Sequence, residues 1–137
     1  MTVLTQTHTF TLAVYGSPYA SMAHTHALKF SSALLTQGHT ITRIFFYREG
    51  VYAALNARVA PQDEGDITAQ WQALQSEYDL SLHVCIANAL KRGIVDQSEA
   101  ERYDKSGATI AAGFELVGLG QLIDGMLTSD RYIEFPA

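Results

Sequence analysis

The sequence predicts an α/β domain with a mostly parallel sheet and helices on both faces. Short β-rich runs alternate along the 137 residues with segments whose apolar residues recur at helical spacing. One run holds Ile44, Phe45 and Phe46 consecutively, which is typical of a strand covered on both faces, as in a parallel sheet. The length suits a single domain, and the chain has neither an internal repeat nor an interdomain linker. Right-handed crossovers then distribute the helices over both faces.

The first strand and the first helix follow directly from local patterns. Phe10–Tyr15 is a β-rich run that Gly16 and Pro18 end with a loop. Apolar residues at i, i+4, i+7 and i+11 predict a helix over residues 23–37. Gly38 stands where a left-handed helix cap is expected, so the helix should stop there.

The middle of the chain predicts strand, loop, helix and strand. Ile41–Tyr47 is the second strand. Arg48–Asp66 contains two glycines and a proline and predicts a long loop that includes one helical turn. Residues 67–78 again carry apolar residues at i, i+4, i+7 and i+11, so they predict the second helix. Leu80–Ala87 is the third strand.

The last part of the chain completes the alternation. Asp96–Tyr103 predicts a short helix, and Phe114–Val117 a fourth strand. Residues 118–120 form a tight strand-to-helix turn, because two glycines flank one leucine. Apolar residues at i, i+3, i+4 and i+7 predict the last helix over residues 119–126. Arg131–Phe135 is the closing strand.

The amino-acid composition excludes several classes of protein. Apolar residues make up 47% and charged residues 17%, which is typical of a globular domain. Nine Lys and Arg against fourteen Asp and Glu give a net charge of −5, which argues against a strongly cationic nucleic-acid-binding domain. No run approaches the ~18 apolar residues of a membrane helix, and the start lacks a signal-peptide pattern. We expect a cytoplasmic domain over residues 10–137, after a flexible, threonine-rich extension over residues 1–9.

The single cysteine, Cys85, is the candidate reactive residue. It lies near the carboxyl end of the third strand, where open α/β sheets gather ligands and reactive groups. Lys91 and Arg92 add positive charge nearby, and a helix after the strand would aim its amides at the sulfur. Both effects favour the thiolate, which is the nucleophile. Composition and position alone favour a small buried core residue, since free cysteines are among the most buried residues.

Other candidate residues carry weaker signals. His83 shares a strand face with Cys85 but is too distant along the strand for a direct Cys–His hydrogen bond. His24 and His26 face different directions on a helix, so they do not predict a metal site. The loop over residues 16–19 matches neither dinucleotide-binding nor P-loop motifs, and no G-x-S-x-G, H-E-x-x-H or C-x-x-C is present. We expect neither a metal nor a cofactor.

The aromatic segment Phe45–Tyr52 has two open interpretations. Its rings either cover the end of the sheet or form an association surface, since aromatic residues and arginine are enriched at interface centres. The residues alone do not decide between them.

Three stretches of the chain, residues 45–52, 84–102 and 113–135, resemble the TusD/DsrE family of sulfurtransferase subunits. The similarity runs in the same order over residues 10–135, nearly the whole chain. The resemblance implies a flavodoxin-like three-layer α/β/α sandwich around a five-stranded parallel sheet. It also implies that Cys85 is the residue that carries sulfur.

The resemblance further implies a role in a sulfur relay. Such a subunit accepts persulfide sulfur from a TusA-like donor and passes it to a TusE-like acceptor, towards 2-thiouridine at the tRNA wobble position. It works in a heterohexamer with TusC-like and TusB-like subunits and is not expected to bind nucleic acid itself. A lone cysteine suits this chemistry, because no neighbouring thiol can discharge the persulfide as an intrachain disulfide.

Three alternatives stay open at this point. A DsrE-type subunit of a DsrEFH complex would serve bacterial sulfur oxidation, and only neighbouring genes distinguish it. A non-catalytic scaffold subunit would lack the cysteine at the strand end, which this chain retains. A small-ligand-binding α/β module is disfavoured, because no phosphate-binding loop is present.

Overall fold

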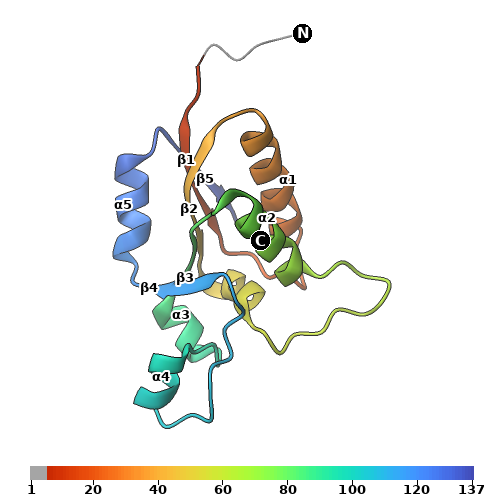
Figure 1. The fold of residues 1–137 in the computed structure, drawn as a ribbon, viewed down its shortest axis with the longest axis vertical. Coiled ribbons are helices and arrows are strands. Elements are labelled where there is room, and N and C mark those ends of the chain that lie inside the picture. Colours follow the sequence, from red (N-terminus) through yellow and green to blue (C-terminus); the bar gives the residue numbers. More distant parts are fainter. Residues whose placement is uncertain (1–5) are drawn as a thin grey trace.

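A computed structural model describes residues 6–137 and contains one five-stranded parallel sheet in the order β4-β3-β2-β1-β5 (Figure 1). The parallel sheet and its five strands confirm the prediction. The strands are β1 (Thr9–Val14), β2 (Thr40–Phe46), β3 (Leu82–Cys85), β4 (Phe114–Val117) and β5 (Arg131–Phe135).

The helices complete a three-layer sandwich (Figure 1). The helices α1 (Ala23–Thr36) and α2 (Ile67–Tyr78) cover one face of the sheet, and α5 (Gly120–Thr128) covers the other. Beyond the carboxyl ends of the strands lie three short helices: the 3-10 helix η1 (Arg48–Ala54), α3 (Ile86–Lys91) and α4 (Gln97–Arg102).

The alternation of strand side chains divides the core between the two faces. The main core lies under α1 and α2, around the fully buried Trp71. A smaller cluster lies on the α5 face and consists of Ala13, Phe45, Cys85 and Leu122. Because both faces of the sheet are covered, Ile44, Phe45 and Phe46 of β2 are all buried, as their consecutive apolar side chains predicted.

Two predicted boundaries are wrong by a few residues. Thr9, which we expected in the N-terminal extension, begins β1: it pairs with Thr40, and its N–H donates to the Asp130 carboxylate at 2.9 Å. The rest of that extension up to residue 5 lies outside the described residues. The third strand ends at Cys85 and not at Ala87, because the helix-favouring segment from Ile86 already forms α3.

The aromatic segment Phe45–Tyr52 covers the end of the sheet with its buried residues. Phe45, Phe46 and Val51 are each 0% exposed. Four of the large apolar side chains that face solvent lie together on and beside α5: Leu119, Ile123, Met126 and Leu127. Tyr47 and Tyr52 are half-buried, and Arg48 between them is exposed, so the interface interpretation stays a prediction for this part of the segment.

The start of η1 is fastened to the end of β1. Tyr47 N–H donates to the Val14 carbonyl oxygen at 3.0 Å, and Gly50 N–H donates to the Tyr47 carbonyl oxygen at 2.9 Å. A Cβ at Gly50 would stand 2.1 Å from the Val14 oxygen, so only glycine allows this approach. This contact fixes the position of η1 relative to the carboxyl end of β1.

His24, which the sequence places two residues before His26, lies in the core and has a structural role. The Trp71 indole N–H donates to His24 Nδ1 at 3.0 Å, so Nε2 carries the proton and donates to the Gly16 carbonyl oxygen at 3.0 Å. Burial lowers the pKa of His24 to about 4, which keeps the ring neutral near pH 7. Over residues 6–137, no three His, Cys, Asp or Glu side chains gather as metal ligands, and no helix is long and apolar enough to cross a membrane.

Candidate functional site

Cys85 is the last residue of β3 and immediately precedes α3, at the carboxyl edge of the sheet as predicted. Its side chain points to the α5 face and is only 4% exposed. Four half-buried side chains complete the cluster: Tyr15 directly after β1, Tyr47 directly after β2, Val117 of β4 and Tyr132 of β5. The sulfur is therefore sheltered, and its surroundings are partly aromatic.

The closest polar partner of the sulfur is Asn88. Its side-chain N–H donates to Cys85 Sγ at 3.0 Å. The sequence analysis missed this residue, although one signal was available. Residues i and i+3 at the start of a helix lie on the same side, so a side chain three positions after Cys85 faces back to it.

Arg92 reaches the sulfur through Asn88. Its guanidinium donates to the Asn88 carbonyl oxygen at 3.1 Å and to the Asn88 side-chain oxygen at 3.4 Å. The same guanidinium is held by Glu49, at 2.5 Å and 3.2 Å. The hydrogen bond to Glu49 raises the pKa of Arg92, to which the charge of Cys85 adds the last and smallest contribution. The arrangement fixes the Asn88 amide with its nitrogen towards the sulfur.

Lys91 differs from Arg92 in its placement. It lies exposed in the last turn of α3, and within the part of the chain described here neither a hydrogen bond nor an ion pair joins it to Cys85. Of the two basic residues singled out in the sequence, the structure brings only Arg92 into the network around Cys85.

His83 points to the α5 face, as its spacing from Cys85 predicted. Its Nε2 lies 3.7 Å from a Glu115 carboxylate oxygen, and its Nδ1 is buried without a hydrogen-bond partner among the described residues. Burial first, and then the charge of Arg43, lower the pKa of His83, which favours the neutral ring. No hydrogen bond in residues 6–137 links it to Cys85, so it does not act as the base of a Cys–His pair.

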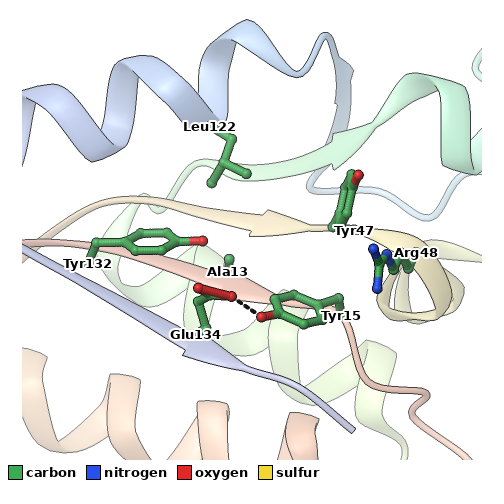
Figure 2. A pocket seen from close by; sticks show the side chains of 7 residues that line it. All are labelled: Ala13, Tyr15, Tyr47, Arg48, Leu122, Tyr132 and Glu134. Carbon is green, nitrogen blue, oxygen red and sulfur yellow. Dashed lines mark hydrogen bonds between the residues drawn. The ribbon is translucent and has the colours of Figure 1, made fainter.

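A cavity of about 210 Å³ opens beside the Cys85 cluster (Figure 2). Tyr15 donates a hydrogen bond from its hydroxyl to Glu134 across this cavity. Burial raises the pKa of Tyr132, which keeps this hydroxyl protonated. Five of the seven lining residues also belong to the cluster around Cys85; the lining residues are Ala13, Tyr15, Tyr47, Arg48, Leu122, Tyr132 and Glu134.

Comparisons with known proteins agree with one another. The DsrE/DsrF-like family matches residues 8–135. The chain is 44% identical to the sulfurtransferase TusD of Cronobacter sakazakii over 126 residues, which covers 92% of this chain and 98% of that protein. It is 42% identical to a TusD homolog of Vibrio parahaemolyticus over 127 residues, covering 93% and 97%.

A solved structure shares the fold. The ychN protein from E. coli superimposes with a TM-score of 0.74 at 20% identity, covering 93% of this chain and 98% of that one. At this identity the likeness concerns the fold alone.

Proposed function

The chain belongs to the DsrE/DsrF-like family and is a sulfur-relay sulfurtransferase subunit, and on that premise we propose that Cys85 carries the sulfur. One observation carries the proposal: the only cysteine of the chain stands at the carboxyl edge of the sheet with a hydrogen-bond donor on its sulfur. A purely structural cysteine needs no such donor, whereas a thiolate is stabilised by it.

Transfer proceeds through two exchanges at Sγ. In the loading step, the Cys85 thiolate attacks the outer sulfur of a donor persulfide, R–S–SH. The new Sγ–S bond forms, the donor S–S bond breaks, and the donor leaves as the thiolate RS⁻, while the proton stays on the transferred sulfur. In the unloading step, an acceptor thiolate attacks that outer sulfur, and Sγ leaves as a thiolate.

Asn88 stabilises the thiolate form of Sγ, which is present at the start of loading and at the end of unloading. Sγ is negative before loading and after unloading, and a hydrogen bond from Asn88 is stronger to a charged sulfur than to a neutral one. Arg92 supports this step by holding the Asn88 side-chain oxygen away from the sulfur. Lys91, which is exposed and further along α3, adds at most a diffuse positive charge.

The relay partners belong to the same proposal. The chain is a member of a Tus sulfur-relay complex. TusC-like and TusB-like subunits would complete a heterohexamer, a TusA-like protein would supply the sulfur, and a TusE-like protein would take it on towards 2-thiouridine in tRNA. The net charge of −5 supports a chain that does not bind tRNA itself. A cytoplasmic location fits a lone thiol that must stay reduced.

Sulfur oxidation in a DsrEFH complex is the second candidate for the destination of the sulfur. The curated relatives described above carry the TusD name, which favours tRNA thiolation. Both destinations use the same exchange at Cys85.

The decisive experiment is intact mass spectrometry after incubation with a cysteine desulfurase, cysteine and a TusA-like carrier. The wild-type chain should gain the mass of one sulfur atom, which a reducing agent removes. Cys85→Ser should gain none, because a hydroxyl holds no stable persulfide. A Cys85→Ser chain that still acquires labile sulfur would contradict the proposal.

A further inference from the structure

We propose that the cavity beside Cys85 receives the anionic persulfide of the sulfur donor and that Arg48, at its rim, attracts this anion. This inference rests on the proposed function and concerns how sulfur reaches the buried thiol. None of the residues singled out in the sequence analysis for chemistry lines this cavity.

The register of the sheet brings the cavity next to the sulfur. Phe46 pairs with Val84 across β2 and β3, so Tyr47 stands opposite Cys85 one position further. Tyr47 packs in the Cys85 cluster and also lines the cavity. Cys85 is 4% exposed, whereas Tyr47 is only half-buried. Because Cys85 itself does not line the cavity, the proposal includes a displacement of the Tyr47 ring that opens the cavity to Sγ.

Arg48 follows Tyr47 and is held in an unfavourable backbone conformation. Its φ of +50° lies in the left-handed region, which residues other than glycine seldom adopt. The hydrogen bonds of Tyr47 and Gly50 fix the backbone on both sides, and the Glu49–Arg92 ion pair ties the next residue to α3. Strained backbone of this kind gathers at functional sites. Here it turns the guanidinium over the Tyr47 ring, 5.6 Å from the ring centre, at the cavity rim (Figure 2).

Arg48 brings a positive charge to the rim of the cavity. Within residues 6–137, Arg48 has no carboxylate at ion-pair distance, in contrast to Arg43, Arg58, Arg92 and Arg102. The cavity does contain one carboxylate, Glu134, which accepts the Tyr15 hydroxyl. An unpaired cation at the rim of a partly enclosed, aromatic cavity attracts anions from solution.

A donor persulfide is the anion that this site must admit. The outer sulfur of a persulfide is more acidic than a thiol, so R–S–S⁻ predominates near neutral pH, and it is repelled by the Cys85 thiolate. Arg48 offsets this repulsion during the encounter. Arg48 acts only while the anion approaches. Before the attack, the outer sulfur takes up a proton from water, which gives the R–S–SH form of the loading step.

Two alkylating reagents of similar size and different charge test this inference on the whole chain. Iodoacetate is an anion and iodoacetamide is neutral, and both modify the single cysteine. Arg48→Gln should lower the ratio of the iodoacetate rate to the iodoacetamide rate by about two- to fivefold. Arg48→Lys should restore most of the ratio, because it keeps the charge. Arg102→Gln, which removes an exposed arginine from α4, should leave the ratio as in the wild type.

The neutral reagent separates charge from structure, since a merely loosened site would change both rates together. Should Arg48→Gln not fold, the wild-type ratio must fall as salt is added, because screening weakens the attraction. An unchanged ratio in a folded Arg48→Gln chain, or a ratio insensitive to salt, overturns the inference. So does a wild-type chain that neither reagent modifies until it is denatured. The mass experiment with the carrier tests the relay itself and is independent of these rates.

Discussion

At the scale of single residues, each side chain near the sulfur fixes the orientation of the next side chain. Glu49 holds Arg92, Arg92 holds the Asn88 side-chain oxygen, and the Asn88 nitrogen is thereby left to donate to Cys85. An amide on its own presents either end equally well. The ion pair removes that freedom, so we expect the reactivity of the thiol to depend on a carboxylate that lies outside the Cys85 cluster.

Asn88→Asp should therefore slow alkylation of Cys85 by iodoacetamide near pH 7, by roughly tenfold. The substitution replaces the donor to Sγ by a carboxylate that repels the thiolate. Alkylation is followed by intact mass over a range of pH. Asn56→Asp, which introduces the same charge at the exposed second asparagine of the chain, is the control. Equal profiles for the two variants would remove Asn88 from the mechanism.

The buried His24 should make stability fall in mild acid. Its pKa is about 4 in the folded chain and about 6.5 when unfolded, so the unfolded chain binds more protons between these values. Its contribution is fully present above pH 6.5 and is lost as the pH falls to 4, by about 3 kcal/mol.

Urea unfolding of the wild type and of His24→Gln between pH 4 and pH 7 checks this prediction. Other groups, such as Asp130 with its lowered pKa, contribute equally to both chains. The difference between the two chains should therefore shrink towards pH 4. A difference that stays constant with pH would show that His24 titrates normally.

At the scale of elements, the site depends on how η1 meets the end of β1. Gly50→Ala should destabilise the fold by about 3 kcal/mol, because its Cβ would stand 2.1 Å from a backbone oxygen that cannot easily move. Gly118→Ala is the matched control, since nothing lies within 4 Å of the added Cβ. Thermal unfolding measures both. Equal melting temperatures would mean that η1 shifts freely against β1.

The elements were predictable to the extent that local pattern decides them. Apolar spacing located α1, α2 and α5, and consecutive apolar residues identified β2 as covered on both faces. The end of β3 was misplaced because Ile86 suits a strand as well as a helix. The sequence did not decide whether Phe45–Tyr52 is exposed, because burial depends on which elements pack against the segment. The spacing of residues does not show this.

The site was predictable only in part. The position of Cys85 followed from the order of strands, and the charge of Arg92 from its proximity in sequence. Arg48 carries no comparable signal in the sequence, because its proposed role depends on a backbone angle and on a cavity built from distant strands. The contact of Asn88 with Cys85 is consistent with its spacing three residues further along the chain.

At the scale of the whole molecule, the two faces of the sheet differ in how completely they are covered. Among the described residues, two helices cover one face, whereas only α5 covers the other (Figure 1). α5 also exposes several apolar side chains. We expect a TusC-like or TusB-like subunit to cover this α5 surface in the relay complex, since exposed apolar patches mark association sites. The surface consists of Leu119, Ile123, Met126 and Leu127.

Leu127→Glu should then prevent assembly with these subunits while the isolated chain stays folded, because the side chain is 80% exposed. Light scattering of the mixed subunits measures assembly. Val59→Glu makes the same change at a side chain that is 86% exposed on a loop away from α5, and it should assemble normally. Normal assembly of Leu127→Glu would show that partners bind another face.

The order of the elements also has a consequence for folding. Cys85 of β3 packs with Ala13 of β1, Phe45 of β2 and Leu122 of α5, which lie far from it in the sequence. The thiol is therefore sheltered only once these distant segments have come together. A chain that is still folding exposes its cysteine to oxidants, whereas the folded domain keeps it covered.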